Sequence, residues 1–502
     1  MVRSGCAATF AALFLFWVGC AAAQDVTLIS RDGRVELSGM LLGFDGEFYR
    51  LQTEYGELTV DGSGVNCSGP GCPNLQDFVA EVQLSGSATM GAVLMPALID
   101  AFAQRNGYAV TRQDLDPTRF AYLLTRKDTG KSAARFGFRA TNTDEGFADL
   151  LADEADIVMA LREIRPQERT HARDAGIGDL TGINRSRVLA LDAVVPVVAP
   201  ANPIKNISPL QLAQVFAGRI TNWQALGGPD APIALHLPDA ASLELTDGIT
   251  RHALPNRIAD AVGKDNLSLG ITSYAEKGGN QVLTLGGTCG FSLDAARRTI
   301  KTEDYPLTAP MFLYFPARRL PLIAREFLAF TRGPAAQNVI RRAGFVDQAP
   351  EEIEIELQGN RFANAITVAG GETSLAELQR MTATLTPMAR LTISFRFETG
   401  SIRLDAQSRS NVQQLARALE QGQYDARQLR FVGFSDGQGA AKANRDIALR
   451  RAEAVRRAVI AAAVTVNLER VELSVDAFGE AMPMACDDTA WGRSVNRRVE
   501  VW

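Results

Sequence analysis

Hydrophobic and polar positions alternate near the N-terminus, which is the pattern of strands that bury one face. Short alternating runs occupy residues 26–29, 35–38, 48–51 and 57–60, with Asp-Gly pairs between them. Asp-Gly favours tight turns between antiparallel strands. Residues 24–73 are therefore predicted to form a small β domain, either a small barrel or a hairpin cap, whose function the pattern does not indicate.

The pattern changes from residue 78, where continuous apolar runs alternate with segments that are compatible with helices. The runs at 156–160 and 193–199 have almost no polar position, as expected for strands that are buried on both faces. A strand-helix alternation of this kind is typical of an α/β domain, which we place at residues 78–350.

A third pattern follows. Acidic and apolar residues alternate at 351–357, which predicts a strand with one solvated acidic face, and Ser374 with Glu377 forms a capping box that opens a helix. We interpret residues 351–390 as a linker that contains this strand and this helix. Residues 391–502 then predict a two-layer α+β sandwich with helices on one sheet face. Its elements are a strand at 391–397, a helix at 406–419, a strand at 428–434, a helix at 441–463 and a strand at 471–477.

The first residues indicate export. Arg3 precedes an apolar stretch at 7–18, and three alanines at 21–23 form an A-x-A cleavage signal, so residues 1–23 are predicted to be a signal peptide. The stretch is shorter than a membrane-spanning helix requires, and a buried N-terminal helix would show polar spacing that is missing here. Cys20 follows part of a lipobox, but Trp17 occupies the position of a small aliphatic residue, which argues against a lipid anchor.

Composition and net charge argue against several classes of protein. The chain has 502 residues, of which 46% are hydrophobic and 22% charged, so two to four folded domains are expected. A formal net charge of −5 argues against wholesale nucleic-acid binding, which needs a basic surface. No stretch after the leader is long and apolar enough to span a membrane. We expect a periplasmic protein associated with the cell wall and outer membrane, without a transmembrane segment in the mature chain.

The cysteines carry one clear prediction. Cys67 and Cys72 bracket a tight Ser-Gly-Pro-Gly turn, and in an oxidising compartment they are expected to form a disulfide. A metal site is disfavoured because no histidine lies near this pair, and no second closely spaced cysteine pair is present to complete a set of metal ligands. The state of Cys289 and Cys486 stays open, since pairing and two free thiols are both compatible with the sequence. We expect no metal and no cofactor.

One motif suggests a serine hydrolase. Gly433, Ser435 and Gly437 match G-x-S-x-G between a predicted strand and helix, the context of a nucleophile elbow. That fold places its histidine after the serine, whereas all three histidines of the chain precede Ser435. Without a base the hydroxyl is a poor nucleophile, so we expect a protein that is not an enzyme.

The same loop fits a binding site better. Asp436 lies before a predicted helix, whose amide groups and dipole keep a carboxylate ionised, and Arg451 lies within that helix. A fixed carboxylate and a fixed guanidinium suit a ligand that carries both an ammonium and a carboxylate group. The alternative is that Asp436 and Arg451 pair with each other on the surface, a contact of about 0–1 kcal/mol.

A set of motifs runs through residues 391–502: FETGS at 397–401, GFSDGQG at 433–439, Asn444 with Arg451 and Ala452, Gly479 with Glu480, and NRRV at 496–499. In these motifs the segment resembles the OmpA-like peptidoglycan-binding domain. The resemblance implies that Asp436 and Arg451 clasp the diaminopimelate side chain of the stem peptide, that Asn444 braces the loop or touches the ligand, and that Ser435 keeps a hydroxyl where the family has threonine.

Two polar loops in the middle domain precede predicted helices. One is LSGSATMG at 84–91 and the other is TNTDEG at 141–146. A glycine-serine loop at a helix N-terminus presents free N–H groups to an anion, although a plain turn with a helix cap gives the same pattern.

The middle domain carries a set of specific motifs: LDAVVPVVAPANP at 191–203, SPLQLAQVFAG at 208–218, RITNW at 219–223, LGITSY at 269–274 and YPL at 305–307. In these motifs residues 78–348 resemble the PstS-like phosphate-binding proteins among the type II periplasmic solute receptors. The resemblance implies two α/β lobes that close on an oxyanion, with Ser87, Thr89, Thr143 and Asp156 on the first-lobe side and Ser242 on the second. For Asp156, a strand-end carboxylate that caps a neighbouring loop is an equal alternative.

The second lobe departs from that family. The positions of its arginine, glycine and threonine hold Pro238, Leu243 and Glu244, which removes a cation and adds a carboxylate that repels anions. We therefore predict a multidomain α/β protein with a small N-terminal β unit, a two-lobed periplasmic-binding-protein-like domain and an OmpA-like sandwich. It is expected to anchor non-covalently to peptidoglycan and to carry a receptor domain for a small anionic solute, phosphate being one candidate. The alternative is the phosphate-binding receptor of an ABC transporter.

Overall fold

The computed structural model describes residues 25–75, 78–182, 184–238, 249–252, 255–287, 291–398 and 401–502, which fall into two compact units that divide at Ala80. The predicted signal peptide, the lipobox cysteine Cys20, Ser242 and Cys289 lie outside the described residues. Each unit is described by itself below.

The first unit is a five-stranded antiparallel sheet with the order β4-β3-β2-β1-β5, so the predicted small β unit is confirmed. Its core is built by alternate residues of β1 and β3, where Val26, Leu28, Tyr49 and Leu51 are at most 1% exposed. The strands are β1 (Asp25–Ser30), β2 (Glu36–Phe44), β3 (Phe48–Thr53), β4 (Gly56–Asp61) and β5 (Val65–Ser68).

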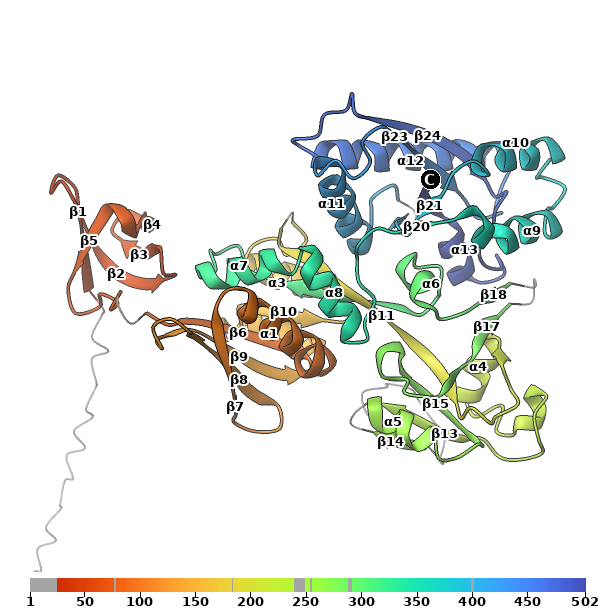
Figure 1. Ribbon diagram of the computed structural model, residues 1–502, viewed down its shortest axis with the longest axis horizontal. Coiled ribbons are helices and arrows are strands. Elements are labelled where there is room, and N and C mark those ends of the chain that lie inside the picture. The colour runs from red at the N-terminus through yellow and green to blue at the C-terminus, as the bar shows by residue number, and fades with distance from the viewer. Residues whose placement is uncertain are drawn as a thin grey trace, which may run out of the picture. The chain divides into compact units, whose positions relative to one another are not determined.

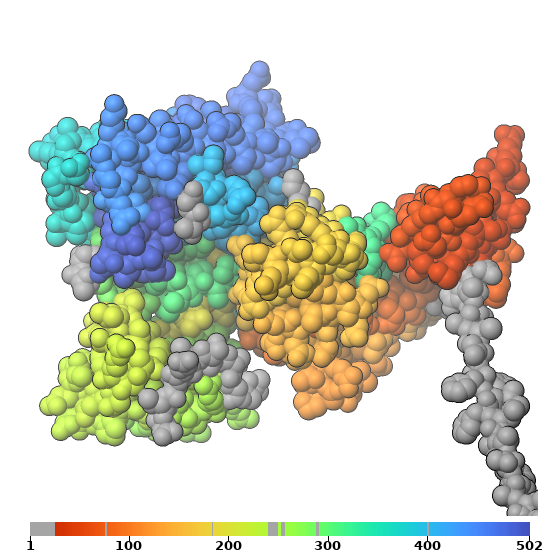
Figure 2. Space-filling model, turned by 180° about the vertical axis from the view of Figure 1, so that it is seen from behind, coloured from red at the N-terminus to blue at the C-terminus, as the bar shows by residue number. Residues whose placement is uncertain are grey.

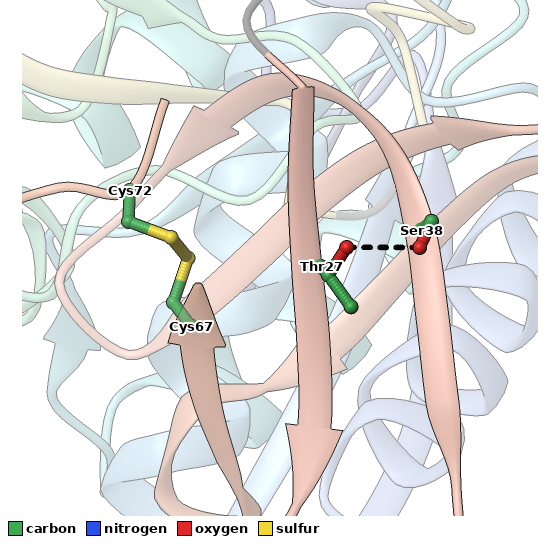
Figure 3. Close-up of a disulfide and its surroundings, with 4 residues drawn as sticks. All are labelled: Thr27, Ser38, Cys67 and Cys72. Carbon is green, nitrogen blue, oxygen red and sulfur yellow. Dashed lines mark hydrogen bonds between the residues drawn. A yellow bond between two sulfur atoms is a disulfide. The ribbon is translucent and has the colours of Figure 1, made fainter. Parts of the chain in front are cut away.

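A disulfide joins Cys67 at the end of β5 to Cys72, as the sequence predicts (Figure 3). The same view shows the hydroxyl groups of Thr27 and Ser38 meeting across β1 and β2 at 2.9 Å. In a unit this small a crosslink restricts the unfolded chain and so favours the folded state.

The second unit begins with a large mixed sheet that is shared by two lobes. The first-lobe part has the order β10-β6-β9-β8-β7, in which β6 and β10 are parallel and β7, β8 and β9 form an antiparallel meander (Figure 1). These strands are β6 (Ala80–Ser87), β7 (Tyr108–Asp114), β8 (Arg119–Arg126), β9 (Ser132–Thr141) and β10 (Ile157–Ala160).

Two strands carry the chain between the lobes. The long strand β11 (Ser186–Val198) pairs with β19 (Thr308–Tyr314) along its first half and with β15 (Ser268–Ser273) along its second half. β15 then pairs in parallel with β13 (Ala234–Pro238), which pairs with β14 (Ile249–His252). This crossover of strands between lobes is the architecture that the sequence resemblance implies. Short strands complete the second lobe: β12 (Asn206–Ile207), β16 (Gln281–Val282), β17 (Thr284–Gly286) and β18 (Ser292–Leu293).

Helices cover these sheets with apolar faces. One face of α1 is apolar and buried: Leu98 and Phe102, with Leu94 just before the helix, are at most 1% exposed. The helices of this region are α1 (Met95–Arg105), α2 (Thr143–Leu151), α3 (Pro166–Asp174), α4 (Pro209–Phe216), α5 (Pro255–Val262), α6 (Arg297–Lys301), α7 (Leu322–Phe330) and α8 (Pro334–Arg342).

The C-terminal part is a four-stranded sheet, order β22-β25-β23-β24, against which α11 and α12 pack (Figure 1). The predicted α+β sandwich is confirmed, although the strand expected at 391–397 is divided into β21 and β22. The elements are β21 (Arg390–Leu391), β22 (Ser394–Arg396), α11 (Ala406–Glu420), β23 (Arg427–Phe434), α12 (Ala441–Ala462), β24 (Val471–Gly479), α13 (Ala490–Asn496) and β25 (Arg498–Val501).

The segment interpreted as a linker is folded and packed. The strand predicted at 351–357 is wrong: only β20 (Glu352–Ile353) is extended, and helices α9 (Gly359–Thr367) and α10 (Leu375–Leu385) follow. The N-cap half of the predicted capping box is confirmed, since Ser374 accepts a hydrogen bond from the backbone of Glu377, while the Glu377 carboxylate pairs with Arg380 and Arg445. Figure 2 shows this segment, in teal, merging with the blue C-terminal part. Apolar side chains of α9 and α10 join one core with Val432, Phe434, Phe478 and Trp502.

Among the described residues, no helix combines the length and the apolar character needed to cross a membrane.

Candidate functional site

The C-terminal candidate site lies where β23 ends and α12 begins. Gly433 allows this junction, because a Cβ atom there would lie 2.1 Å from the carbonyl oxygen of Ala448. Helix α12 can therefore pack directly on the strand end. The loop that follows holds Ser435 and Asp436, which are 3% and 8% exposed.

Asp436 forms its ion pair with Arg497, at the C-terminal end of α13, rather than with Arg451. The alternative of an Asp436–Arg451 surface pair is therefore wrong for the described residues, because this carboxylate pairs with Arg497 and forms no ion pair with Arg451. Sequence reasoning did not assign Arg497 to the site, although the NRRV motif offered the signal. The next residue, Arg498, is fully buried and pairs with Glu500.

Arg451 projects from α12 into the same region and is only 4% exposed. Its guanidinium carbon lies 5.2 Å from the centre of the Phe397 ring, a cation–π contact. Its Nε is buried and has no hydrogen-bond partner in the described part of the chain. Burial lowers the pKa of Arg451, and the neighbouring charge of Arg497 lowers it further, while Asp436 opposes both effects. Arg451 is thus a buried cation with an unused donor.

Hydrogen bonds brace the loops around these side chains. The side-chain amide of Asn444 donates to Glu480 at 2.7 Å, and the backbone N–H of Gly437 donates to Asp487 at 2.6 Å. Asn496 donates to the other oxygen of Asp487 at 2.8 Å. The Ser435 hydroxyl is buried and, within the described residues, makes no hydrogen bond. Chemically, the site offers one carboxylate, two guanidinium groups and a free hydroxyl.

The second candidate site is on the first lobe, at the carboxyl ends of β6 and β10. Ser87 ends β6, and its Oγ accepts a hydrogen bond from Met90 N at 3.3 Å. Thr143 begins α2, and its Oγ accepts from Leu161 N at 3.0 Å, which ties this helix to the end of β10. Thr89 stands between β6 and the π-helical turn Met90–Leu94 that leads into α1. Ser87, Thr89 and Thr143 therefore lie on one edge of the lobe.

The structure does not bring Asp156 to that edge. β6 and β10 are parallel with Leu84 opposite Ile157, so Asp156 lies at the amino end of β10, beside the middle of β6. Its carboxylate accepts from Gln83 N at 2.7 Å and pairs with Arg318 at 2.7 Å. The expected place of Asp156 in the cleft is corrected on this geometry, which agrees with the alternative of a strand-end carboxylate that holds a neighbouring segment.

A charged residue that the sequence reasoning missed stands at the carboxyl end of β10. The Arg162 guanidinium donates to both oxygens of Glu168, at 2.6 and 2.9 Å, and also pairs with Asp144. Hydrogen bonding to Arg162 lowers the pKa of Asp144. The sequence feature that could have indicated Arg162 is its position just after an apolar strand. Two carboxylates already neutralise this cation.

The second-lobe side is only partly described, because Ser242 lies outside the described residues. β13 ends at Pro238, where the resembled family has its arginine. On the same strand His236 contacts His252 at 3.0 Å and Ser268 at 3.1 Å. Burial lowers the pKa of His236, and the second histidine lowers it further. At neutral pH His236 therefore supplies no positive charge for an anion.

Comparison with known proteins agrees with this architecture. The PBP superfamily domain matches residues 75–333, which is more than half of the chain. The chain belongs to this superfamily. The OmpA family matches residues 396–497, so this superfamily member carries an OmpA-family domain behind its receptor-like domain.

Two relatives of the superfamily domain are named phosphate-binding protein PstS. The protein from Staphylococcus haemolyticus is 25% identical over 239 residues, 43% of this chain and 73% of the relative. The protein from Staphylococcus epidermidis is 24% identical over 300 residues, 53% of this chain and 88% of the relative.

Two solved structures are each similar to a part of this chain. An ABC-type phosphate transport receptor from Vibrio cholerae is 18% identical and covers 53% of this chain and 99% of its own, with a TM-score of 0.39. A peptidoglycan-associated lipoprotein from Burkholderia pseudomallei is 26% identical and covers 22% of this chain and 86% of its own, with a TM-score of 0.19.

Proposed function

We propose that this chain is a periplasmic binding protein without enzymatic activity, anchored non-covalently to peptidoglycan through its OmpA-family domain. Its receptor-like domain binds a small anionic solute. The observation that supports the anchoring is the incompletely satisfied cluster of the buried residues Ser435, Asp436 and Arg451 with the partly exposed Arg497.

The cluster supports a zwitterionic ligand for a physical reason. A buried donor without a partner costs about 1–3 kcal/mol, and both the Nε of Arg451 and the hydroxyl of Ser435 are in that state. A ligand carboxylate beside Arg451 would accept those bonds, and a ligand ammonium beside Asp436 would take part of the carboxylate that Arg497 now occupies. The diaminopimelate end of a stem peptide carries both groups. This ligand also agrees with the match to the OmpA family.

The receptor-like domain supports an anionic solute less specifically. Ser87 and Thr143 accept hydrogen bonds from backbone N–H groups, so each hydroxyl can still donate its own proton. The names of the relatives support phosphate. The neutralised Arg162 and the proline at position 238 argue against a strong cation in the cleft. We therefore propose a small anion as the solute and keep phosphate as one candidate for it.

The alternative is a phosphate receptor that feeds an ABC transporter. It is favoured by the similarity to PstS proteins and requires tight binding of free phosphate. Calorimetry on the full mature chain separates the two functions. Micromolar or tighter binding that is lost in Thr143→Val would favour the transport receptor, whereas absence of phosphate binding would leave another anion as the solute.

The anchoring is tested by retention on purified diaminopimelate-type peptidoglycan. Asp436→Asn removes the charge that an ammonium needs, and retention is expected to fall by about tenfold or more. The matched control is Asp446→Asn, a change of the same kind within α12. Equal retention of both variants and the wild type would contradict the proposed anchoring.

A further inference from the structure

A cavity of about 810 Å³ lies within the second unit, between the receptor-like domain and the OmpA-family domain. Its walls come from the start of β11, from the segment that joins α7 to α8, and from α11 with the last turn of α12. Pockets for small organic ligands commonly have volumes of 300–1,000 Å³. This space is therefore larger than a single inorganic anion needs, and it is separate from both candidate sites above.

The charge of the lining is one-sided. The described lining residues include four arginines, Arg187, Arg332, Arg409 and Arg417, and no aspartate or glutamate. Most of the remaining polar groups are amides and hydroxyls. Protein surfaces usually carry charged residues of both signs. A concave wall whose charged residues are all cations creates a positive potential, which attracts anions.

Among these arginines, Arg187 gives the clearest indication of a ligand site. Its Nη1 donates to the carbonyl oxygen of Leu328 at 2.7 Å, while its Nε and Nη2 are buried and lack hydrogen-bond partners among the described residues. Phe315 lies beneath it, with 5.9 Å between the guanidinium carbon and the ring centre. These two N–H groups form the edge of the guanidinium that pairs with the two oxygens of a carboxylate or phosphate. Both are closed to solvent in this structure, so the side chain must turn toward the cavity to make that contact.

Two of the other arginines, Arg332 and Arg417, are close enough to lower the pKa of Arg187. Burial lowers the pKa of Arg187 well below its ordinary range, and the charges of Arg332 and Arg417 lower it further. Arg332 has one weak bond, to Asn184 at 3.4 Å, and is largely exposed at the mouth of the cavity. Glu420 offsets part of the mutual repulsion of these cations at Arg417, and a ligand anion in the cavity would offset more of it.

Two structural features prepare the cavity for such a ligand. Helix α8 begins at its wall with Gly333 and Pro334, so the positive end of the helix dipole faces the same space. The two domains are already joined beside it, because Gln348 accepts hydrogen bonds from Gln407 at 3.1 Å and from Gln414 at 3.0 Å. Binding therefore does not need to create the interface.

We propose that this arginine pocket binds a small organic anion with two or more carboxylate or phosphate groups. Arg187 and Arg332 come from the receptor-like domain and Arg417 from the OmpA-family domain, so the ligand bridges the two. Its binding links the wall-anchoring domain to the receptor-like domain. This inference does not depend on the identity of the solute in the cleft.

The test is calorimetric titration of the mature full-length chain with citrate and with pyrophosphate. We expect the wild type to bind at least one of them with a Kd below about 1 mM. Arg417→Gln is expected to weaken binding by about tenfold or more, because a charge-assisted contact is lost, and Arg417→Lys by less. Arg332→Gln, at the exposed mouth, provides a second variant that does not disturb the interior.

Arg457→Gln is the matched control, because Arg457 lies on α12 with a side chain that is 66% exposed and pairs with Glu453 at only 3.9 Å. Its binding should equal that of the wild type. The proposal is overturned if neither probe binds the wild type below about 10 mM, or if both Arg417→Gln and Arg332→Gln bind as the wild type does. The second result would place any binding elsewhere, for example in the cleft.

Discussion

Two clusters of arginines and carboxylates occur in the second unit, and they differ in how well their donors are matched. In the interdomain ion cluster (Asp304, Arg361, Arg390, Arg498 and Glu500), Arg390 donates to both oxygens of Asp304, at 2.7 and 3.1 Å. Glu500 accepts from Arg498 at 2.7 Å and from the Trp502 indole at 2.9 Å. In the C-terminal site, Arg451 has a buried Nε without a partner among the described residues.

The difference separates a structural from a binding role. Burial alone would raise the pKa of Glu500, but Arg361, Arg390 and Arg498 lower it well below its ordinary range. In the ion cluster every arginine has a carboxylate partner, and even the Nε of Arg390, which makes no hydrogen bond, lies 3.4 Å from Glu500. Arg451 forms no ion pair among the described residues, so its buried guanidinium remains costly until a ligand binds. Removing a partner should therefore destabilise the first cluster, and removing Arg451 should affect binding more than folding.

The largest effect is expected for Asp304→Asn, because it leaves the guanidinium of Arg390 buried with half of its partners. Breaking a buried ion pair by removing one member costs about 3–5 kcal/mol. The measurement is urea-induced unfolding followed by circular dichroism and tryptophan fluorescence. An unchanged midpoint would mean that the cluster is not a structural element and would remove the basis of the comparison.

The next effect depends on pH and concerns Glu303, beside the ion cluster. Burial raises the pKa of Glu303 to about 8 from its ordinary 4.5, the charge of Asp405 adds to this, and one carboxyl oxygen is buried without a partner in the described chain. The protonated folded state contributes stability that is complete below pH 4.5 and is lost as the pH rises through 8.

Glu303→Gln should therefore stabilise the protein at pH 8.5, by up to about 3 kcal/mol, and this advantage should disappear near pH 5. Melting temperatures of both proteins between pH 5 and pH 9 measure it. Parallel curves for wild type and variant across this range would contradict a protonated Glu303.

The free-energy change expected for Arg451→Gln is smaller, and it concerns the binding of peptidoglycan rather than the stability of the fold. Retention on peptidoglycan should fall by about tenfold to one hundredfold, corresponding to about 1.5–3 kcal/mol for a charge-assisted contact. The melting temperature should change little, since the lost cation had an unmatched donor. Arg457→Gln on the same helix is the control. A strong loss of stability without a specific loss of retention would make Arg451 structural.

The smallest effect is expected at an exposed pair of the same residue types. Arg427 and Glu352 are 2.9 Å apart, with side chains that are 57% and 37% exposed. Arg427→Gln should change the unfolding free energy by less than about 1 kcal/mol, because water screens and competes with such pairs. A change as large as that of Asp304→Asn would show that pairing, rather than burial, controls these energies.

The local features of this protein could be predicted from the sequence. Helices α11 and α12, strand β23, the Ser374 cap and the Cys67–Cys72 disulfide depend on residues that are close in the chain. Side-chain periodicity and short-range hydrogen bonding therefore suffice to indicate them. The prediction for residues 351–357 was wrong, because the alternating pattern did not reveal that α9 and α10 pack on the C-terminal sheet.

Only the tertiary structure decided which distant charges meet. Strand register places Asp156 beside Gln83 and away from Ser87, while the end of α13 brings Arg497 to Asp436. The arginine pocket joins Arg187 and Arg417, which are far apart in sequence. The sequence by itself determined the order of domains and the residue types of the C-terminal site. Charge pairing depends on distance and burial, and only packing between distant segments sets those quantities.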